Sequence, residues 1–197
     1  MGMDVSGCNP HINKSIEQYT TYQQLESLSF KERDVEFSKD SMVQEKYWEE
    51  QDSFYKDNPG IYFRNNCWWW RPLWTYCAIV DDGELISEDT YHSGHNNDGA
   101  GLDAKDSVKL AVKLQVTIED GSCQSYKKDY EEHLAGLPPE NCFRCNNNNH
   151  GNNKKRECKN CDKTGVRENF GASYPFSVDN VKNFIAFLKD CGGFEIW

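Results

Sequence analysis

The sequence predicts an α+β fold that is mainly helical, with short strands and an inserted four-cysteine zinc knuckle. Three observations support this prediction. Apolar residues recur at helical spacing in several long segments, the extended apolar pieces are short, and two C-x-x-C pairs stand close together. A chain of 197 residues fits one domain. We therefore expect a single domain over 1–197, with a polar helical insertion at 11–57 and the knuckle at 140–168.

The first half of the chain is divided by turn-forming residues. Residues 41–54 are predicted to form a helix, because their apolar side chains fall near one helical face. Asn58-Pro59-Gly60 predicts a turn, and a short extended piece follows it at 61–66. Pro72 suits the first turn of a helix, which we expect to end at Asp81-Asp82-Gly83.

A loop and a helix are expected next. Residues 91–101 are rich in glycine, asparagine and histidine, so we expect a surface loop without regular structure. Asp103 can cap a helix over residues 104–119. The side chains predicted to face inward from this helix are Val108, Ala111, Val112 and Ile118.

The last part of the chain holds two further helices and a closing strand. Residues 124–134 carry Tyr and Leu at helical spacing, which indicates a helix. Ser177 can cap the final helix, which Gly192-Gly193 ends. Residues 194–197 then form an apolar strand, which a homodimer would cover. The predicted inward face of the final helix consists of Val178, Val181, Phe184, Ile185 and Leu188.

The knuckle is the clearest metal motif in the sequence. Its two C-x-x-C pairs are formed by Cys142, Cys145, Cys158 and Cys161. Four thiolates at this spacing suit a tetrahedral Zn²⁺ site, which is predicted to be structural because no coordination position stays open. The residues between the pairs, 146–157, are too polar to hold themselves in place, and a metal at their two ends would explain how they become ordered.

The second cysteine pair stands in the segment CKNCDKTG (158–165), which keeps one glycine of a C-x-x-C-x-G-x-G unit. In this respect the knuckle is similar to the cysteine-rich domain of J-domain cochaperones. The likeness covers the knuckle alone, and no J domain is present. The resemblance therefore implies zinc binding, and chaperone function does not transfer.

The overall charge restricts the partners. The net charge of -10 makes a groove for duplex nucleic acid improbable, because such a groove depends on neutralising phosphates. Residues 154–167 form a basic exception, which either balances the charge of metal-bound thiolates or serves as a docking surface. No apolar run is long enough to span a membrane, and the N-terminus lacks the features of a secretory signal. We expect a cytoplasmic protein that does not enter membranes.

Tryptophan is concentrated in one segment, at Trp68, Trp69, Trp70 and Trp74. On a helix Trp70 and Trp74 share a face while Trp68 points elsewhere, so the four rings cannot all enter one core. Either they pack this segment between two layers, or they form a stacking platform for a base, with Arg64 and Arg71 as anion contacts. The residues predicted to bind a ligand are Arg64, Asn65, Trp68, Trp69, Trp70, Arg71, Trp74, His95, Asn97 and Asp98.

Two histidines and an aspartate in the following segment raise the question of catalysis. His92, His95 and Asp98 stand close together in the sequence, and such a group could bind a metal or perform acid–base chemistry. No phosphate-binding loop, dinucleotide fingerprint, H-E-x-x-H motif or nucleophile elbow occurs. A nucleotide-acting enzyme that uses these three residues remains an alternative to a binding protein.

Four motifs together carry a wider resemblance. They are YFRNNCWWWRPLW (62–74), NDGAGL (97–102), YPFSVDNV (174–181) and GGFEI (192–196). On these motifs the chain resembles a family of small proteins found in phages and their bacterial hosts. It departs from the family pattern in its long polar stretch and in having asparagines where the knuckle is usually rich in glycine. The resemblance implies a phage setting and brings no activity with it.

These observations favour a cytosolic binding protein that captures a nucleotide-like small molecule and, if phage-encoded, counters a host defence. The first alternative is an interaction module whose acidic surface or basic knuckle docks on a host protein and inhibits it. The second is the nucleotide-acting enzyme. A single structural zinc accompanies each of the three hypotheses.

Overall fold

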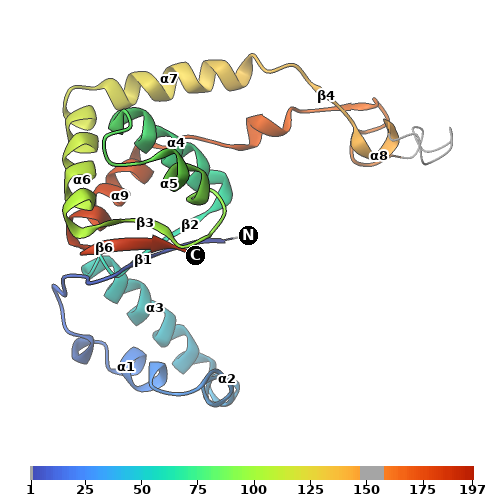
Figure 1. Ribbon diagram of the computed structural model, residues 1–197. Helices are drawn as coiled ribbons and strands as arrows, with labels where there is room; N and C mark the ends of the chain where they lie inside the picture. The colour runs from blue at the N-terminus through green and yellow to red at the C-terminus, as the bar shows by residue number, and fades with distance from the viewer. Residues whose placement is uncertain (1, 147–157) are drawn as a thin grey trace.

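The computed structural model of the protein describes residues 2–146 and 158–197 (Figure 1). It confirms the predicted class, because helices dominate and the strands are short. A four-stranded sheet lies in the centre, with most helices on one side and the helices of the N-terminal insertion on the other. No helix in these ranges is long and apolar enough to cross a membrane.

The central sheet is antiparallel throughout, with strand order β2-β1-β6-β3. Its strands are β1 (Gly2–Gly7), β2 (Tyr62–Asn66), β3 (Ala100–Asp103) and β6 (Gly193–Ile196). Alternate side chains of β1 and β6 are buried, as expected for strands with one face on a core. The buried face packs against helices, and the opposite face carries polar side chains.

The apolar strand β6 lies between β1 and β3, so its backbone is paired on both sides. Phe194 and Ile196 are buried in the same core as the helices. A homodimer is therefore not needed to cover this strand, because β1 and β3 of the same chain already pair with it.

The main core forms between the sheet and four helices. These are α4 (Cys67–Asp81), α6 (Ala104–Glu119), α7 (Ser122–Ala135) and α9 (Val178–Asp190). The largest fully buried side chains of this core include Trp70, Trp74, Phe184, Phe187 and Phe194. Such aromatic burial supplies a large apolar area per residue, which offsets the low apolar content of the chain.

The final helix, α9, follows the sequence prediction closely. The Ser177 side chain accepts a hydrogen bond from the Asn180 backbone N–H and so caps the helix. The predicted apolar stripe faces the core, where Val181, Phe184, Ile185 and Leu188 are buried. The helix predicted over 124–134 is also confirmed, because α7 includes all of these residues.

Helix α6 has the predicted bounds but a different inward face. Asp103 caps it by accepting from the Asp106 N–H. Val112 is 57% exposed, and Val108 is exposed as well, so the prediction that both face inward is wrong. The buried stripe lies about 100° around the helix, at i, i+3, i+4 and i+7 spacing. It consists of Ser107, Leu110, Ala111 and Leu114.

Helix α4 begins five positions earlier than predicted, at Cys67 instead of Pro72. The reason is an N-cap: the Asn66 side chain accepts from the backbone N–H groups of Trp68 and Trp69. Pro72 therefore lies inside the helix, where it cannot donate to the carbonyl one turn earlier. The predicted end of the helix is confirmed.

The segment 91–101 is more regular than expected. Helix α5 (Glu88–Ser93) enters it from one side and β3 from the other, so the irregular loop is reduced to 94–99. Ser87 caps α5 by accepting from the Thr90 N–H. β3 forms because it pairs with β6, which is a distant partner that local sequence cannot reveal.

The insertion at 11–57 contains a short 3-10 turn, η1 (Ile16–Gln18), and the helices α1 (Thr20–Glu26), α2 (Phe30–Lys39) and α3 (Ser41–Asp57). It has a small hydrophobic cluster of its own, formed by Tyr19, Tyr22, Leu25, Tyr47 and Phe54. Asn58 is fully buried at its end and accepts from the N–H groups of Asn13 and Lys14. This side chain therefore ties the two ends of the insertion together.

The knuckle leaves the body after α7 and returns before α9. Its elements are β4 (Glu140–Asn141), α8 (Phe143–Asn146) and β5 (Val166–Arg167), and the short helix η3 (Phe170–Ser173) leads back to α9. Figure 1 shows the described part of the knuckle standing away from the sheet and the main helices. Among the described residues, β4 and β5 pair with each other in a sheet separate from the central one.

Candidate functional site

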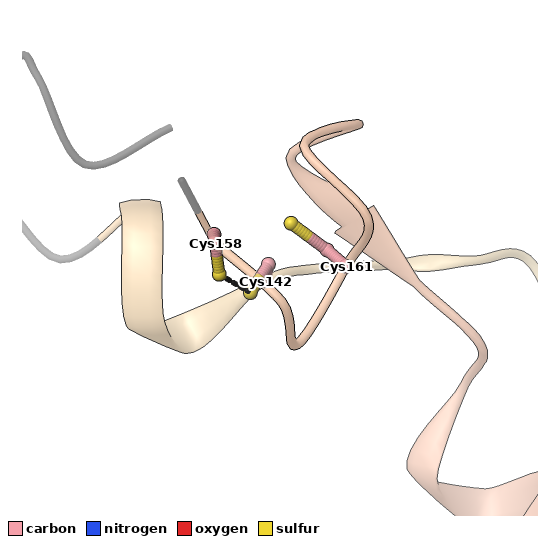
Figure 2. A group of neighbouring side chains, drawn as sticks. All are labelled: Cys142, Cys158 and Cys161. Carbon is pink, nitrogen blue, oxygen red and sulfur yellow. Dashed lines mark hydrogen bonds between the residues drawn. The ribbon is translucent and has the colours of Figure 1, made fainter. Parts of the chain in front are cut away.

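Three of the predicted cysteine ligands come together in the knuckle (Figure 2). The Sγ atoms of Cys142, Cys158 and Cys161 all lie within 4.8 Å of one another, and those of Cys142 and Cys158 are 3.8 Å apart. Four sulfurs around a tetrahedral zinc at 2.3 Å would be separated by about 3.8 Å. The three thiols, of which Cys142 and Cys161 are buried, can therefore hold a metal ion.

The local backbone explains how the thiols are placed. β4 and β5 pair, and the Cys142 N–H donates to the Gly165 carbonyl, which brings the two segments of the knuckle side by side. After Cys161 the chain turns tightly through left-handed residues, Asp162 (φ 44°) and Lys163 (φ 69°). The Gly165 N–H then reaches the Cys161 Sγ at 3.3 Å. Such N–H···S bonds stabilise a thiolate and orient it toward a metal.

The fourth predicted ligand, Cys145, lies in α8, but its side chain is outside the described residues. The basic residues Lys154, Lys155 and Arg156 also lie outside them. The role of Cys145 as a ligand, and that of the basic segment as a docking surface, thus stay predictions.

The tryptophan segment divides between the core and the surface. Trp70 and Trp74 are fully buried and stacked, with ring centroids 5.5 Å apart. Their Nε1–H groups donate to the carbonyls of Gly94 and Tyr91 at 2.7 and 3.1 Å. No ring surface remains for a ligand, so the prediction of a stacking role is wrong for these two residues.

Trp69 takes the opposite position, with 38% of its surface exposed. It lines a cavity of about 540 Å³, which we call the Arg64 cavity. Two further predicted ligand residues, Arg64 and Asn65, line the same cavity. The complete lining consists of Gly2, Arg64, Asn65, Asn66, Trp69, Ser177, Asp179, Asn180 and Asn183.

Hydrogen bonds fix part of the wall of the Arg64 cavity and leave part of it free. Asn65 Nδ2 donates to Asn180 Oδ1 at 3.1 Å, and Asn180 Nδ2 donates to the Trp69 carbonyl. The side chains of Arg64 and Asn183, by contrast, make no hydrogen bond or ion pair with any other described residue. The cavity therefore has a braced wall and two polar side chains that can bind a ligand.

Two helix N-termini meet at this cavity. Asn66 caps α4 and Ser177 caps α9, and both caps belong to the lining. The N-terminal end of a helix carries a partial positive charge, so both ends favour an anion, and the Arg64 guanidinium adds a full charge. Asp179 is the one carboxylate in the lining. The sequence predicts the Ser177 cap, but no local signal places it beside Arg64.

Arg71 and Trp68 lie on another side of the protein. Arg71 lines a separate cavity of about 420 Å³, the Arg71 cavity, which lies between α4, α7 and the segment 169–174. Its Nη1 donates to the Tyr174 hydroxyl at 2.8 Å. Trp68 is half-buried against the rings of Phe170 and Tyr174. The two predicted arginines therefore serve different cavities.

The histidines and Asp98 do not converge on one point. His92 is exposed and faces Glu88, whereas His95 is half-buried with its ring edge-on to Tyr91. Asn97 donates to the Gly2 carbonyl, and Asp98 is exposed. The cysteine triad is the one group of potential metal ligands found among the described residues. The proposed catalytic set of His92, His95 and Asp98 is thus not assembled as a metal site.

His95 has an unusual environment. Its Nδ1 is buried and has no hydrogen-bond partner among the described residues. Burial lowers the pKa of His95, and the positive charge of Arg71 and the nearby His92 lower it further. The folded protein therefore favours the neutral form of this imidazole.

Replacing His95 with glutamine should flatten the dependence of stability on pH. The folded protein binds fewer protons at this site than the unfolded chain, so stability rises with pH and falls as pH drops below the ordinary histidine value of about 6.5. Thermal melts from pH 7 to pH 5 would measure this slope. The exposed His11 serves as control: H11Q should keep the wild-type slope, and an equal slope in H95Q would contradict the expectation.

Comparison of the chain with models of protein families, with curated proteins and with solved structures gave no match. The resemblance to phage proteins thus stays a prediction. Two of the four motifs that carry it nevertheless meet in space. The Arg64 cavity takes Arg64, Asn65 and Trp69 from the first motif and Ser177, Asp179 and Asn180 from the third.

Proposed function

We propose that this protein captures a small nucleotide-like ligand in the Arg64 cavity. The observation that carries the proposal is the lining: a partly exposed indole, a guanidinium without a described partner and a carboxamide without one all border the same space. The volume of about 540 Å³ falls in the range of about 300–1,000 Å³ that small-molecule sites occupy.

Each lining group has a role that suits a nucleotide. The Trp69 ring offers a face on which a base can stack. Arg64 can pair with a phosphate in bidentate fashion, and the N-termini of α4 and α9 support the same charge. Asn183 supplies both donors and an acceptor for base edges, and Asp179 can accept from a ribose hydroxyl or an amino group.

The sequence motifs and the net charge indicate where this protein would act and on what kind of ligand. An acidic protein of net charge -10 is unsuited to long nucleic acids but can hold a small ligand in a cavity that offers an arginine and two helix N-termini. With the resemblance to phage proteins, we infer a cytoplasmic protein that sequesters a host signalling nucleotide and thereby counters a defence. Capture of this kind requires no turnover.

The metal in this proposal is zinc, and its role is structural. Cys142, Cys158 and Cys161 supply sulfur ligands at distances that suit tetrahedral coordination, with Cys145 as the fourth ligand. Clustered thiolates prefer zinc over magnesium or calcium.

Native mass spectrometry of protein purified from cells, before and after mild denaturation, tests the capture. The wild type should carry a small molecule that denaturation releases. Trp69→Ala and Arg64→Gln should each reduce the affinity for that molecule about tenfold or more, because stacking and a charged hydrogen bond are each lost. Trp48→Ala removes another exposed tryptophan and Lys105→Gln another exposed cation, and both should bind as the wild type does.

A protein that carries zinc but no small molecule would contradict the proposal. A host protein that copurifies instead would favour an interaction module. One observation supports this second candidate: Phe30 and Met42 in the insertion are 72% and 74% exposed. If the copurified protein is lost in a Phe30→Ser, Met42→Ser double variant but kept in Trp69→Ala, the insertion is the docking surface.

A further inference from the structure

The Arg71 cavity differs in chemistry from the Arg64 cavity. Its volume is about 420 Å³. Half of its lining residues are aromatic or aliphatic, whereas the lining of the Arg64 cavity is rich in carboxamides. The apolar part of the lining is formed by Pro72, Tyr130, Leu134, Leu137 and Tyr174. No residue lines both cavities.

The charge of Arg71 is not matched by an acid. Within the described part of the chain no carboxylate lies within 4 Å of its guanidinium, whereas Arg33 pairs with Glu26 and Arg167 with Glu140. At the wall of an apolar cavity, such a guanidinium favours an anion.

The guanidinium is held in place without being neutralised. Its Nη1 donates to the Tyr174 hydroxyl at 2.8 Å, and its Cζ lies 5.7 Å from the centre of the same ring. A neutral hydroxyl and an aromatic face position the charge but leave its other donors free. Arg71 is thus oriented for a ligand.

The walls of the cavity are also braced. The Tyr130 hydroxyl donates to the Tyr174 carbonyl at 2.9 Å and joins α7 to the segment before α9. Asn169 Nδ2 donates to the Pro138 carbonyl at 3.0 Å and links the two connections of the knuckle. A cavity that is already formed loses less entropy when it binds a ligand.

We propose that the Arg71 cavity is a second binding site, for a small amphipathic anion. The ligand would place a carboxylate or sulfonate on Arg71 and a flat or aliphatic body against Tyr130, Leu134 and Tyr174. Thr75 and His133 line the same space and add two polar contacts. A single guanidinium suits a ligand with one negative charge. The apolar walls can bury the apolar part of such a ligand, whereas the carboxamide-rich Arg64 cavity cannot.

Titration of the full-length protein with anilinonaphthalene sulfonate, an aromatic anion that fluoresces when buried, tests this inference. The wild type should bind the dye saturably. Arg71→Gln should weaken binding about tenfold or more, because a charged hydrogen bond is lost. Leu134→Glu should abolish it by placing a carboxylate in the cavity. Arg64→Gln should bind as the wild type does, which separates this site from the proposed nucleotide site.

Melting temperatures of the variants must stay close to that of the wild type, because partly unfolded proteins also bind this dye. If Arg71→Gln lowers the melting temperature, the dye affinity of Leu134→Glu decides the question instead. Wild-type affinity in folded Arg71→Gln and Leu134→Glu would overturn the inference. So would an equal loss in Arg64→Gln, which would place the dye in the other cavity.

Discussion

Replacing Cys161 with serine should release the metal and unfold the described parts of the knuckle, 140–146 and 158–168, while the sheet and the main helices stay folded. Cys161 is one of the three clustered thiols, and its Sγ accepts the Gly165 N–H. Metal binding in isolated zinc fingers contributes about 10–16 kcal/mol, all of it to folding. The strands β4 and β5 have two residues each and cannot replace that contribution.

Metal analysis and limited proteolysis would measure this effect. Zinc per chain should fall from about one to near zero, and protease should cut the variant within 140–168. Cys8→Ser is the matched control, because Cys8 is exposed and lies far from the cluster in the sequence. Zinc retained at the wild-type level in Cys161→Ser would contradict the site. Loss of the whole fold would show instead that the knuckle belongs to the main cooperative unit.

Replacing Trp70 with alanine should lower the free energy of unfolding by about 3–5 kcal/mol. The ring is fully buried, stacks on Trp74 and meets the Phe184 ring edge-on at 5.5 Å. Its removal also leaves the Gly94 carbonyl without its donor. Trp69→Ala at the adjacent position should cost about 0.5 kcal/mol or less, because that ring is partly exposed.

Urea unfolding followed by far-ultraviolet circular dichroism would compare the two variants without relying on tryptophan fluorescence. We expect the two variants to differ in which property they lose. Trp70→Ala should lower stability, whereas Trp69→Ala should lower the affinity for the ligand. Equal stability losses would contradict this division of the tryptophan segment. Trp70→Phe, which keeps most of the apolar volume, should recover part of the loss.

The helices of the second half could be predicted because their signals are local. Asp103 and Ser177 accept hydrogen bonds from N–H groups three residues ahead, and the apolar spacing of α9 matches its buried face. The inward face of α6 could not be predicted in the same way. Valine and leucine stripes both fit a helix there, and packing against the rest of the fold decides between them.

The division of the tryptophans depended on one residue. Once Asn66 caps α4, the register places Trp70 and Trp74 inward and Trp69 outward. The sequence prediction placed Trp70 and Trp74 on one helical face but, with the helix starting at Pro72, could not decide which rings face the core. The Arg64 cavity has a second cause that is not local: β2 and the start of α9 are more than a hundred residues apart in the chain.

The position of β6 inside the sheet has a consequence for how the protein folds. Gly7 pairs with Phe194, and Asp4 exchanges two backbone hydrogen bonds with Trp197, so the sheet joins segments almost a full chain length apart. Closing so long a loop costs entropy, and the favourable contacts form only after the loop is closed. Folding slows as contacts become less local. We expect α6, α7 and α9 to collapse early, and the pairing of β1 with β6 to be the late, rate-limiting step.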